Sequence, residues 1–340
     1  MTVPDFHQEV QIAGAGGPES LQIRRQPIPR PRPGKVLIEV AAAGVNRHDC
    51  NQRAQGVAHD GTLVPGLEVC GKVVMLGEGA DAGLAGERVM ALVPGGGYAQ
   101  YAIADEALVL PAPDNLSDAE AASLPEALFT AWYNFFVLMK LDRDGFGLIH
   151  GGTSGVGHVA LQAISALGYR VLATAGTDEK VAAAKRFGAF EALNYNDPAL
   201  ADKARAATGG HGIDALLDLS AGAHIDADLA MMAPGGRIAH LSGGNGKAIT
   251  VPLRNLMARQ IWITGSLLRP LPLASKALLA DMLRRDVLPL LKQGAIRPHI
   301  AARFPLTEAW RAHHMMEQNS HIGKIVLVAE DNIHEREDQS

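Results

Sequence analysis

A short apolar strand that runs into a glycine-rich turn is the feature that most restricts the fold of this chain. The strand covers residues 146–150, the turn reads GGTSGVG over residues 151–157, and an apolar helix continues to Leu167. Glycines in such a turn let the backbone approach a pyrophosphate and let helix and strand pack without Cβ clashes. The N–H groups at the start of the helix can then bind a phosphate. The run therefore predicts a dinucleotide-binding βαβ unit and makes an oxidoreductase the leading function.

The composition limits the class of protein. With 340 residues, of which 47% are hydrophobic and 20% charged, the chain is long enough for two domains. A net charge of -5 and the lack of a dense Lys and Arg run argue against a nucleic-acid partner. Residues 1–10 lack the apolar core of a signal peptide, and no apolar run reaches the ~20 residues of a membrane span. Cys50 and Cys70 do not make a disulfide framework, so we expect a cytoplasmic protein without nucleic-acid or membrane partners.

The first third of the chain is rich in strands and turns, and the pattern changes near Ser117. Closely spaced Pro and Gly separate strand patterns at 35–42, 69–76 and 86–93. Ser117, with Glu120 three residues on, has the arrangement of a capping box. A helical pattern follows over residues 119–140 and is broken near Pro125.

From residue 146 onward, strands and helices alternate. We expect strands at 146–150, 170–174, 192–195, 213–219, 236–241 and 261–267, with helices at 156–167, 178–187, 198–207 and 224–232. Six strands in this order predict an α/β fold, a doubly wound parallel sheet of the Rossmann type with right-handed crossovers.

The end of the chain returns to the first region. Helices are expected at 275–293 and 307–317, and the strand KIVLV at 324–328 needs a sheet to join. The sheet of the first third is the natural host. We therefore predict a β-rich domain at 1–128, a dinucleotide-binding domain at 129–268, a return to the first domain at 269–330, and a disordered polar tail at 331–340.

The turn after the second strand bears on the choice of nucleotide. In NAD-binding relatives of this fold, an acid at the end of that strand holds the ribose 2′-hydroxyl. Here the strand runs into Ala175, Gly176 and Thr177, so no acid stands at its tip. Hydroxyl and amide donors would accept a 2′-phosphate, and Lys180 and Tyr195 could cradle it. NADPH is favoured over NADH.

Two observations weigh against that choice. Asp178 and Glu179 lie close by, although they suit the first turn of a helix capped by Thr177. Lys180 also suits an exposed helix position without any ligand. The sequence therefore leaves NADH open.

An ordered set of short motifs, spread over about nine tenths of the chain, carries a family resemblance. The motifs are AAGVNRHD at 42–49, PGLEVCG at 65–71, GERV at 86–89, GGGYAQY at 95–101, the glycine turn, NY at 194–195, GSLLR at 265–269 and HIGKIVL at 321–327. With these motifs the chain resembles the medium-chain dehydrogenases/reductases, and within them the zinc-free zeta-crystallin/NADPH:quinone oxidoreductase branch.

The resemblance implies a GroES-like catalytic domain and a Rossmann domain with the active site between them. It implies that Asn46 lies near the nicotinamide, and that the cofactor contacts include Thr130, Ser154, Gly155, Val156, Lys180 and Tyr195. Segments that match the nicotinamide side include Leu241, Gly243, Leu267 and Leu268. A C-terminal arginine of some relatives has no clear counterpart, and Asn319 or His321 could stand near its place.

The two positions that hold catalytic zinc ligands in the related alcohol dehydrogenases argue against a metal. They read Asn46 and Leu67 here, and neither side chain is a good zinc ligand. His48, Asp49 and Cys50 form a small cluster, which is more simply explained by a structural cysteine beside polar surface residues. We expect no metal.

Without zinc, alcohol oxidation lacks its Lewis acid, whereas a quinone or a conjugated carbonyl accepts hydride directly. We predict that Asn46 acts in catalysis by donating a hydrogen bond to cofactor or substrate, the alternative being a structural asparagine that caps the turn after its strand. Tyr98, His48 and Gln52 are candidate proton donors by neighbourhood only.

Three functions remain in competition. The main one is an NADPH:quinone oxidoreductase; the second is an enoyl or alkenal C=C reductase; the third is a non-catalytic NADPH-binding sensor or structural protein. The apolar strand at 261–265 (IWITG) has the character of an exposed sheet edge, which tends to pair. We therefore predict a homodimer formed through the sixth strand of the Rossmann domain.

Overall fold

The computed structural model describes residues 3–220, 222–243 and 248–329, and the chain divides into two compact units. Unit 1 comprises Met1–Glu126, Leu273–Arg284 and Arg297–Ser340, and unit 2 comprises Ala127–Pro272 and Arg285–Ile296. The segment 285–296, which the sequence assigns to the return of the first domain, thus belongs to unit 2. The predicted tail at 331–340 lies outside the described residues.

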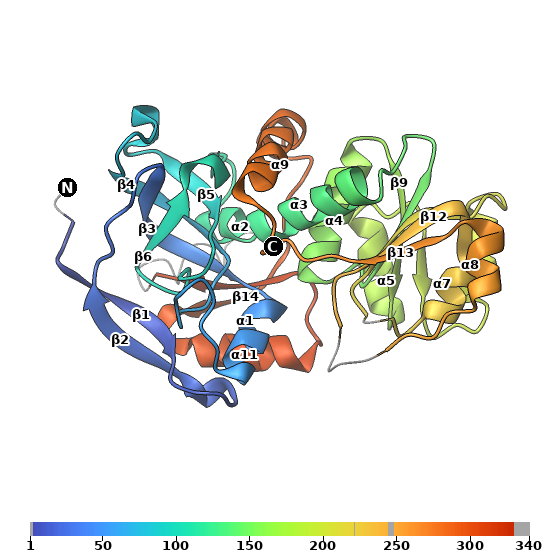
Figure 1. Cartoon of the computed structure of the whole chain (residues 1–340), viewed down its shortest axis with the longest axis horizontal. Helices are drawn as coiled ribbons and strands as arrows, with labels where there is room; N and C mark the ends of the chain where they lie inside the picture. Colours follow the sequence, from blue (N-terminus) through green and yellow to red (C-terminus); the bar gives the residue numbers. More distant parts are fainter. Residues whose placement is uncertain (1–2, 221, 244–247, 330–340) are drawn as a thin grey trace. The chain divides into compact units, whose positions relative to one another are not determined.

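Unit 1 is built on a seven-stranded sheet with the order β14-β15-β3-β4-β5-β7, in which β6 also pairs with β3 (Figure 1). A separate antiparallel hairpin is formed by β1 and β2. In chain order the elements are β1 (Phe6–Ile12), η1 (Pro18–Ser20), β2 (Leu21–Pro27), β3 (Lys35–Val45), α1 (Arg47–Gln55), β4 (Glu68–Leu76), η2 (Ala82–Leu84), β5 (Arg88–Leu92), β6 (Tyr101–Asp105), η3 (Glu106–Leu108), β7 (Val109–Pro111), α2 (Asp118–Ala122), α9 (Leu273–Asp286), β14 (Ile300–Pro305), η5 (Leu306–Glu308), α11 (Ala309–Gln318) and β15 (Lys324–Val328).

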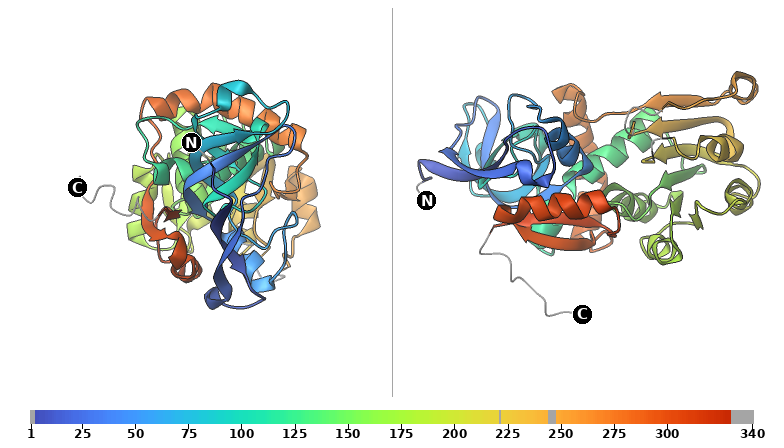
Figure 2. Two further views of the ribbon diagram at one scale, coloured as in Figure 1. Left: turned by 90° about the vertical axis from the view of Figure 1, so that its left-hand side faces the viewer. Right: turned by 90° about the horizontal axis from the view of Figure 1, so that it is seen from below.

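The C-terminal strand β15 joins the sheet of the first third, as predicted. It pairs antiparallel with β3, placing Ile325 opposite Val45, and parallel with β14. All five residues of β15 are buried, which explains why this apolar strand needs a host sheet. The preceding helix α11 packs against α1 (Figures 1 and 2), where Arg53 of α1 pairs with Glu317 of α11.

Unit 2 has a six-stranded parallel sheet with the order β10-β9-β8-β11-β12-β13, so the predicted doubly wound Rossmann sheet is confirmed. The order reverses between β8 and β11. The elements are α3 (Pro125–Trp132), η4 (Tyr133–Leu138), β8 (Phe146–His150), α4 (Gly155–Ala166), β9 (Arg170–Ala175), α5 (Asp178–Arg186), β10 (Ala192–Asn194), α6 (Leu200–Ala207), β11 (Ile213–Asp218), α7 (Ile225–Met231), β12 (Met232–His240), α8 (Leu253–Arg259), β13 (Trp262–Gly265) and α10 (Leu288–Lys292).

Local chemistry explains where the predicted helices begin and break. The capping box at Ser117 is confirmed, since its backbone N–H donates to Glu120 Oε2 at 2.8 Å and its hydroxyl accepts from the Glu120 N–H at 3.3 Å. The helical pattern at 119–140 forms three pieces, α2, α3 and η4, with α3 beginning at Pro125. The predicted helix at 275–293 is also divided, because Pro289 has no N–H and suits only the first turn of the new helix α10. Among the described residues, no helix combines the length and apolar character that a membrane crossing requires.

Candidate functional site

The glycine turn after β8 has the geometry of a phosphate-binding turn. Gly151 has φ +78°, in the left-handed region, and its N–H and that of Gly152 donate to the Thr174 carbonyl at 3.1 and 3.0 Å. Ser154 caps α4 by accepting the Gly157 N–H at 3.0 Å. A Cβ on Gly157 would lie 2.9 Å from the Cα of Gly152 and closer still to the Gly151 carbonyl oxygen. This close approach keeps the first turn of α4 against the end of β8, where helix N–H groups can bind an anion.

The turn after β9 brings a glycine and a tyrosine together, and a lysine follows in the first turn of α5. A Cβ on Gly176 would lie 2.6 Å from Cζ of Tyr195 and closer still to its hydroxyl oxygen, so the phenol covers this glycine. Thr177 caps α5 by accepting the Lys180 N–H at 3.2 Å. The carboxylate of Asp178 accepts from the Asn194 amide at 3.3 Å, in the first turn of α5 as its sequence position indicates.

The ends of β11 and β12 carry a pair formed by a buried Asp and a half-buried His, which the sequence analysis did not single out. His240 Nδ1 lies 2.6 Å from Asp218 Oδ2, and the same carboxylate accepts the N–H groups of Ser220 and Gly222, both at 2.6 Å. Burial favours the protonated acid, but the hydrogen bonds from His240, Ser220 and Gly222 outweigh it and hold the pKa of Asp218 well below its usual range. The only signal in the sequence is an acid at the end of a buried strand.

A second polar group that the sequence analysis missed lies at the end of β8. Buried His150 makes hydrogen bonds of 2.7 Å with both Thr174 Oγ1 and Asp228 Oδ1. Its ring lies 5.1 Å from that of His224, which in turn lies 4.9 Å from the ring of Tyr195. These residues are far apart in sequence, and only the parallel sheet brings them to one edge.

Most of the predicted cofactor-binding residues therefore lie at the carboxyl edge of the unit 2 sheet. They follow the ends of β8, β9, β10, β12 and β13, and they are Ser154, Gly155, Val156, Gly176, Thr177, Lys180, Tyr195, Leu241, Gly243, Leu267 and Leu268. Leu267 is exposed, whereas Leu268 is buried. Thr130 is set in α3, where it is buried and its carbonyl accepts the Asn134 amide at 2.8 Å. Binding of a cofactor by these residues stays a prediction.

Asn46 belongs to unit 1, at the junction of β3 and α1, and its amide is held by two buried charges. Its Nδ2 donates to Glu68 Oε1 at 2.9 Å, and Lys324 Nζ donates to its Oδ1 at 2.8 Å. Lys324 and Glu68 form an ion pair, and their side chains are only 1% and 0% exposed. Oε2 of Glu68 accepts the N–H of Glu126 at 2.9 Å. The amide thus has a fixed orientation.

Asp49 ties Asn46 to the loop that precedes Glu68. Its carboxylate accepts the N–H of Asn46 at 2.8 Å, the N–H of Gly66 at 3.1 Å and the hydroxyl of Tyr98 at 3.1 Å. Burial raises the pKa of Asp49 to about 6, against the lowering effect of these hydrogen bonds. Asp49 therefore has a structural task in this unit.

The three candidate proton donors are each held by other partners within unit 1. The Tyr98 hydroxyl is buried between Asp49 and His313, whose Nε2 lies 3.1 Å away, and burial raises the pKa of Tyr98 well above its usual value. Gln52 donates to the carbonyls of Val57 and Thr62, both at 3.3 Å.

The third candidate, His48, lies with its Nε2 2.9 Å from Nδ1 of His59. Of the two residues considered for a C-terminal contact, Asn319 accepts a hydrogen bond from Arg47 at the end of α11. Neither observation assigns a ligand to these side chains.

The residues at the positions of the zinc ligands do not fit a zinc ion. The Lys324 ammonium already lies against Asn46 and Glu68, and a second cation beside it would be repelled. Leu67 is apolar and buried. Within residues 3–220, 222–243 and 248–329, no three His, Cys, Asp or Glu side chains are grouped so that they could hold a metal ion.

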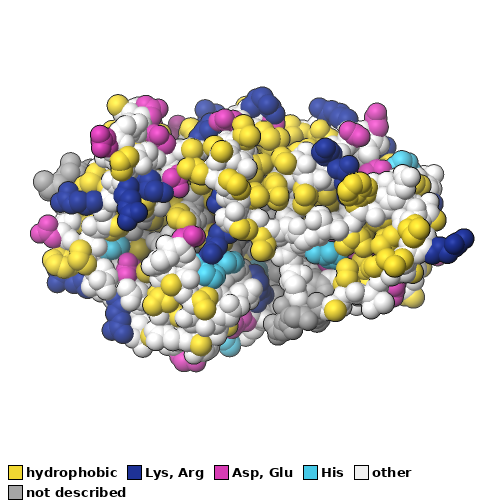
Figure 3. Space-filling model, viewed as in Figure 1, with side chains coloured by type: hydrophobic (Ala, Val, Ile, Leu, Met, Phe, Trp, Pro, Cys, Tyr) yellow, Lys and Arg dark blue, Asp and Glu magenta, His cyan; other side chains and the backbone are white. Residues whose placement is uncertain are grey.

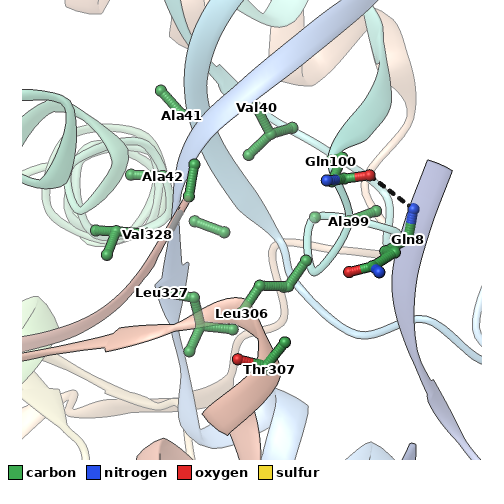
Figure 4. Close-up of a pocket in the computed structure, with 13 residues that line it drawn as sticks. Gln8, Val40, Ala41, Ala42, Ala99, Gln100, Leu306, Thr307, Leu327 and Val328 are labelled. Atoms are coloured by element: carbon green, nitrogen blue, oxygen red, sulfur yellow. Dashed lines mark hydrogen bonds between the residues drawn. The ribbon is translucent and has the colours of Figure 1, made fainter. Parts of the chain in front are cut away.

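A small pocket of about 200 Å³ lies within unit 1, between β1, β3, β15 and η5 (Figure 4). Its walls are mostly aliphatic and include Val40, Leu306 and Leu327, while the Gln8 N–H donates to Gln100 Oε1 at 2.8 Å along one side. It contains no titratable side chain and none of the predicted site residues, so it is separate from the candidate site.

Comparison with known proteins agrees with both units. Residues 32–114 match the family model described as alcohol dehydrogenase GroES-like domain, and residues 155–283 match the one described as zinc-binding dehydrogenase. The quinone oxidoreductase of Sus scrofa is 31% identical over 325 residues, which covers 94% of this chain and 97% of that protein. The 2-haloacrylate reductase of a Burkholderia species is 29% identical over 325 residues, covering 92% and 96%.

Among solved structures, a mycobacterial protein in complex with NADPH superimposes with a TM-score of 0.83. It is 29% identical, and the match covers 94% of this chain and 99% of that one. The GroES-like and Rossmann units, the ordered motifs and these relatives of nearly equal length agree with one another: the chain belongs to the quinone oxidoreductase family of the medium-chain dehydrogenases/reductases.

Proposed function

We propose that the chain is a zinc-independent, NADPH-dependent oxidoreductase that transfers hydride to quinones. The observation that carries this proposal is the group formed by Gly176, Thr177, Lys180 and Tyr195 at the end of β9 and β10. It offers hydroxyl and backbone donors where the fold rule puts the adenosine 2′-position, Lys180 lies in the first turn of α5, and the carboxylate of Asp178 accepts from Asn194. The quinone oxidoreductase relatives and the NADPH-bound mycobacterial structure support it.

The residues present fit a dinucleotide. The close contact at Gly157 leaves the first turn of α4 open to the pyrophosphate, and Tyr195 covers Gly176, which has no side chain to obstruct it. When bound, NADPH supplies the hydride. Leu241, Gly243, Leu267 and Leu268 follow β12 and β13, beyond the point where the strand order reverses, and we assign them to the nicotinamide half.

We assign Asn46 the task of orienting the cofactor or the acceptor. One proton of its Nδ2 is donated to Glu68, and the other makes no hydrogen bond with the described residues. Lys324 and Glu68 prevent the amide from turning over, so this second proton keeps one direction. A fixed donor is what positioning of an acceptor oxygen requires.

The absence of suitable zinc ligands favours an acceptor that is already electrophilic. A quinone or conjugated carbonyl spreads the negative charge that the hydride brings, so positioning supplies much of the acceleration.

A second candidate, reduction of an activated C=C bond, is favoured by the relative named 2-haloacrylate reductase. We also keep the prediction of a cytoplasmic location.

We expect the purified protein to oxidise NADPH in the presence of 1,2-naphthoquinone or 1,4-benzoquinone. A Lys180→Gln variant is expected to raise KM for NADPH about tenfold, because a charge-assisted contact to the 2′-phosphate is lost, and to leave KM for NADH unchanged. Lys185→Gln, in the last turn of the same helix, is the matched control and should change neither value. Steady-state absorbance at 340 nm measures KM for NADPH and for NADH in the wild type and in each variant.

Other results would point elsewhere. Turnover of crotonyl-type substrates alone would establish the C=C reductase, and tight NADPH binding without turnover of any acceptor would leave a non-catalytic NADPH-binding protein. One zinc ion per chain retained through dialysis would contradict zinc independence.

We further propose that the chain forms a homodimer through β13. This strand is at the edge of the sheet, and three large apolar side chains on β13 and the neighbouring helix α8 are exposed: Trp262 by 65%, Leu253 by 69% and Met257 by 76%. Figure 3 shows hydrophobic side chains gathered over this end of unit 2. An exposed apolar edge of this kind tends to pair with a second copy.

The dimer is expected to become a monomer when Trp262 is replaced by glutamate, because charge is then placed on the apolar edge. Sedimentation velocity at micromolar concentration measures the mass, and Phe190→Glu, an exposed aromatic elsewhere in unit 2, is the control. A wild-type monomer at this concentration refutes the proposal.

A further inference from the structure

The loop between β11 and α7 places a histidine beside the tyrosine of the proposed 2′-phosphate site. The ring centroids of His224 and Tyr195 lie 4.9 Å apart, and the two ring planes are tilted by 32° to each other. Tyr195 in turn covers Gly176 in the turn after β9. His224, Tyr195 and Gly176 therefore occupy one continuous patch at the carboxyl edge.

The imidazole of His224 has hydrogen-bonding capacity that the protein does not use. Its side chain is half-buried, and its ring nitrogens form no hydrogen bond with the described residues. His150 behind it differs, because both of its nitrogens are bonded, to Thr174 and Asp228. A polar ring that makes only ring contacts at a ligand-binding edge is available to a ligand.

The charged groups around His224 define its protonation state. His150 faces it from β8, Asp218 from β11 and Asp228 from α7. Burial lowers the pKa of His224, with His150 acting in the same direction and the two carboxylates opposing it. In the free protein the ring is neutral at pH 7, and a nearby phosphate dianion would favour uptake of a proton.

We propose that His224, positioned by its ring contact with Tyr195, is an additional ligand of the 2′-phosphate of NADPH and contributes to discrimination against NADH. The inference rests on the proposed NADPH dependence. A phosphate that accepts from the Tyr195 hydroxyl would lie beside the His224 ring, whose centroid is 4.9 Å from that of Tyr195, so the imidazole adds a second donor to the one that Tyr195 offers. Adenine stacking on His224 is the alternative, and it would involve both nucleotides equally.

The test measures binding, which does not depend on turnover. The Kd of NADPH and of NADH is obtained by fluorescence titration for the wild type, His224→Gln and His224→Ala. His224→Ala is expected to raise the Kd of NADPH about tenfold and to leave that of NADH unchanged, and the glutamine, which keeps a donor, is expected to recover part of the loss. His211→Ala is the control, because His211 precedes β11 at the opposite end of that strand.

A second measurement detects the proton. Calorimetric titrations in two buffers of different ionisation enthalpy, at pH 7, are expected to show more proton uptake on NADPH binding by the wild type than by His224→Gln, with no such difference for NADH. A purely structural role of His224 would leave this difference at zero. Equal losses of NADPH and NADH affinity, or none, overturn the inference. A wild type that prefers NADH shows instead that the proposed NADPH dependence is wrong.

Discussion

A Lys324→Met variant is expected to lose about 3–5 kcal/mol of the free energy of unfolding of unit 1. Lys324 and Glu68 are both buried, and the carboxylate of Glu68 would keep only the amide of Asn46 and the N–H of Glu126 as partners. An uncompensated buried charge is far costlier than a lost surface ion pair. Thermal unfolding should show a decrease in Tm of about 10 °C.

The same substitution at Lys35 is the matched control. Lys35 pairs with Asp105 at 2.8 Å in the same sheet, but the two side chains are 30% and 19% exposed. Lys35→Met is therefore expected to cost less than about 1 kcal/mol.

Removing the charges of both Lys324 and Glu68 separates the energy of their ion pair from the energy of side-chain packing. When Lys324→Met is combined with Glu68→Gln, a neutral amide replaces the buried carboxylate at position 68. This amide can still accept the Glu126 N–H and make a hydrogen bond with Asn46, so the double variant should be more stable than Lys324→Met alone. A double variant with the summed cost of the two single changes would show that the charges contribute independently, which contradicts the burial argument.

This buried pair illustrates which parts of the chain its sequence could predict. The glycine turn, the strand–helix alternation and the helix caps are local patterns, so the sheet of unit 2 and the capping box at Ser117 followed from neighbouring residues. The apolar pattern of β15 also indicated that it needed a host sheet. The strand pattern did not indicate that Lys324 is buried and ion-paired, because its partners Asn46 and Glu68 are 278 and 256 residues away in the sequence.

The candidate site shows the same limit. Gly176, Thr177, Lys180 and Tyr195 could be named because the fold rule assigns a ligand position to the end of the second strand. His150, Asp228 and His224 could not, since they are brought together only when parallel strands and a loop meet at one edge. The candidate proton donors show a related limit: nearness in sequence does not show that Tyr98 is buried against Asp49 and His313.

A Gly157→Ala variant is expected to lose about 100-fold in kcat/KM for NADPH and to be less stable than the wild type. The added Cβ would lie 2.9 Å from the Cα of Gly152 and closer still to the carbonyl oxygen of Gly151. Both are backbone atoms of the turn, so they can give way only if the turn moves away from the start of α4. Steady-state kinetics and thermal unfolding measure the two effects.

Helix propensity alone would make Gly157→Ala more stable than the wild type, so a loss of stability can be assigned to the close contact. Alanine in place of glycine inside a helix stabilises by about 1 kcal/mol when there is room for it, whereas overpacking against backbone costs about 1–3 kcal/mol. Gly14→Ala, where no atom lies within 4 Å of the added Cβ, should leave stability and kcat/KM close to the wild type. If Gly157→Ala also left stability and kcat/KM unchanged, α4 could shift without loss of cofactor binding. The phosphate would then have to be bound elsewhere. If stability fell while kcat/KM did not, the contact at Gly157 would serve only the packing of α4 against β8. Loss of both together is the result that ties this glycine to the binding of the pyrophosphate.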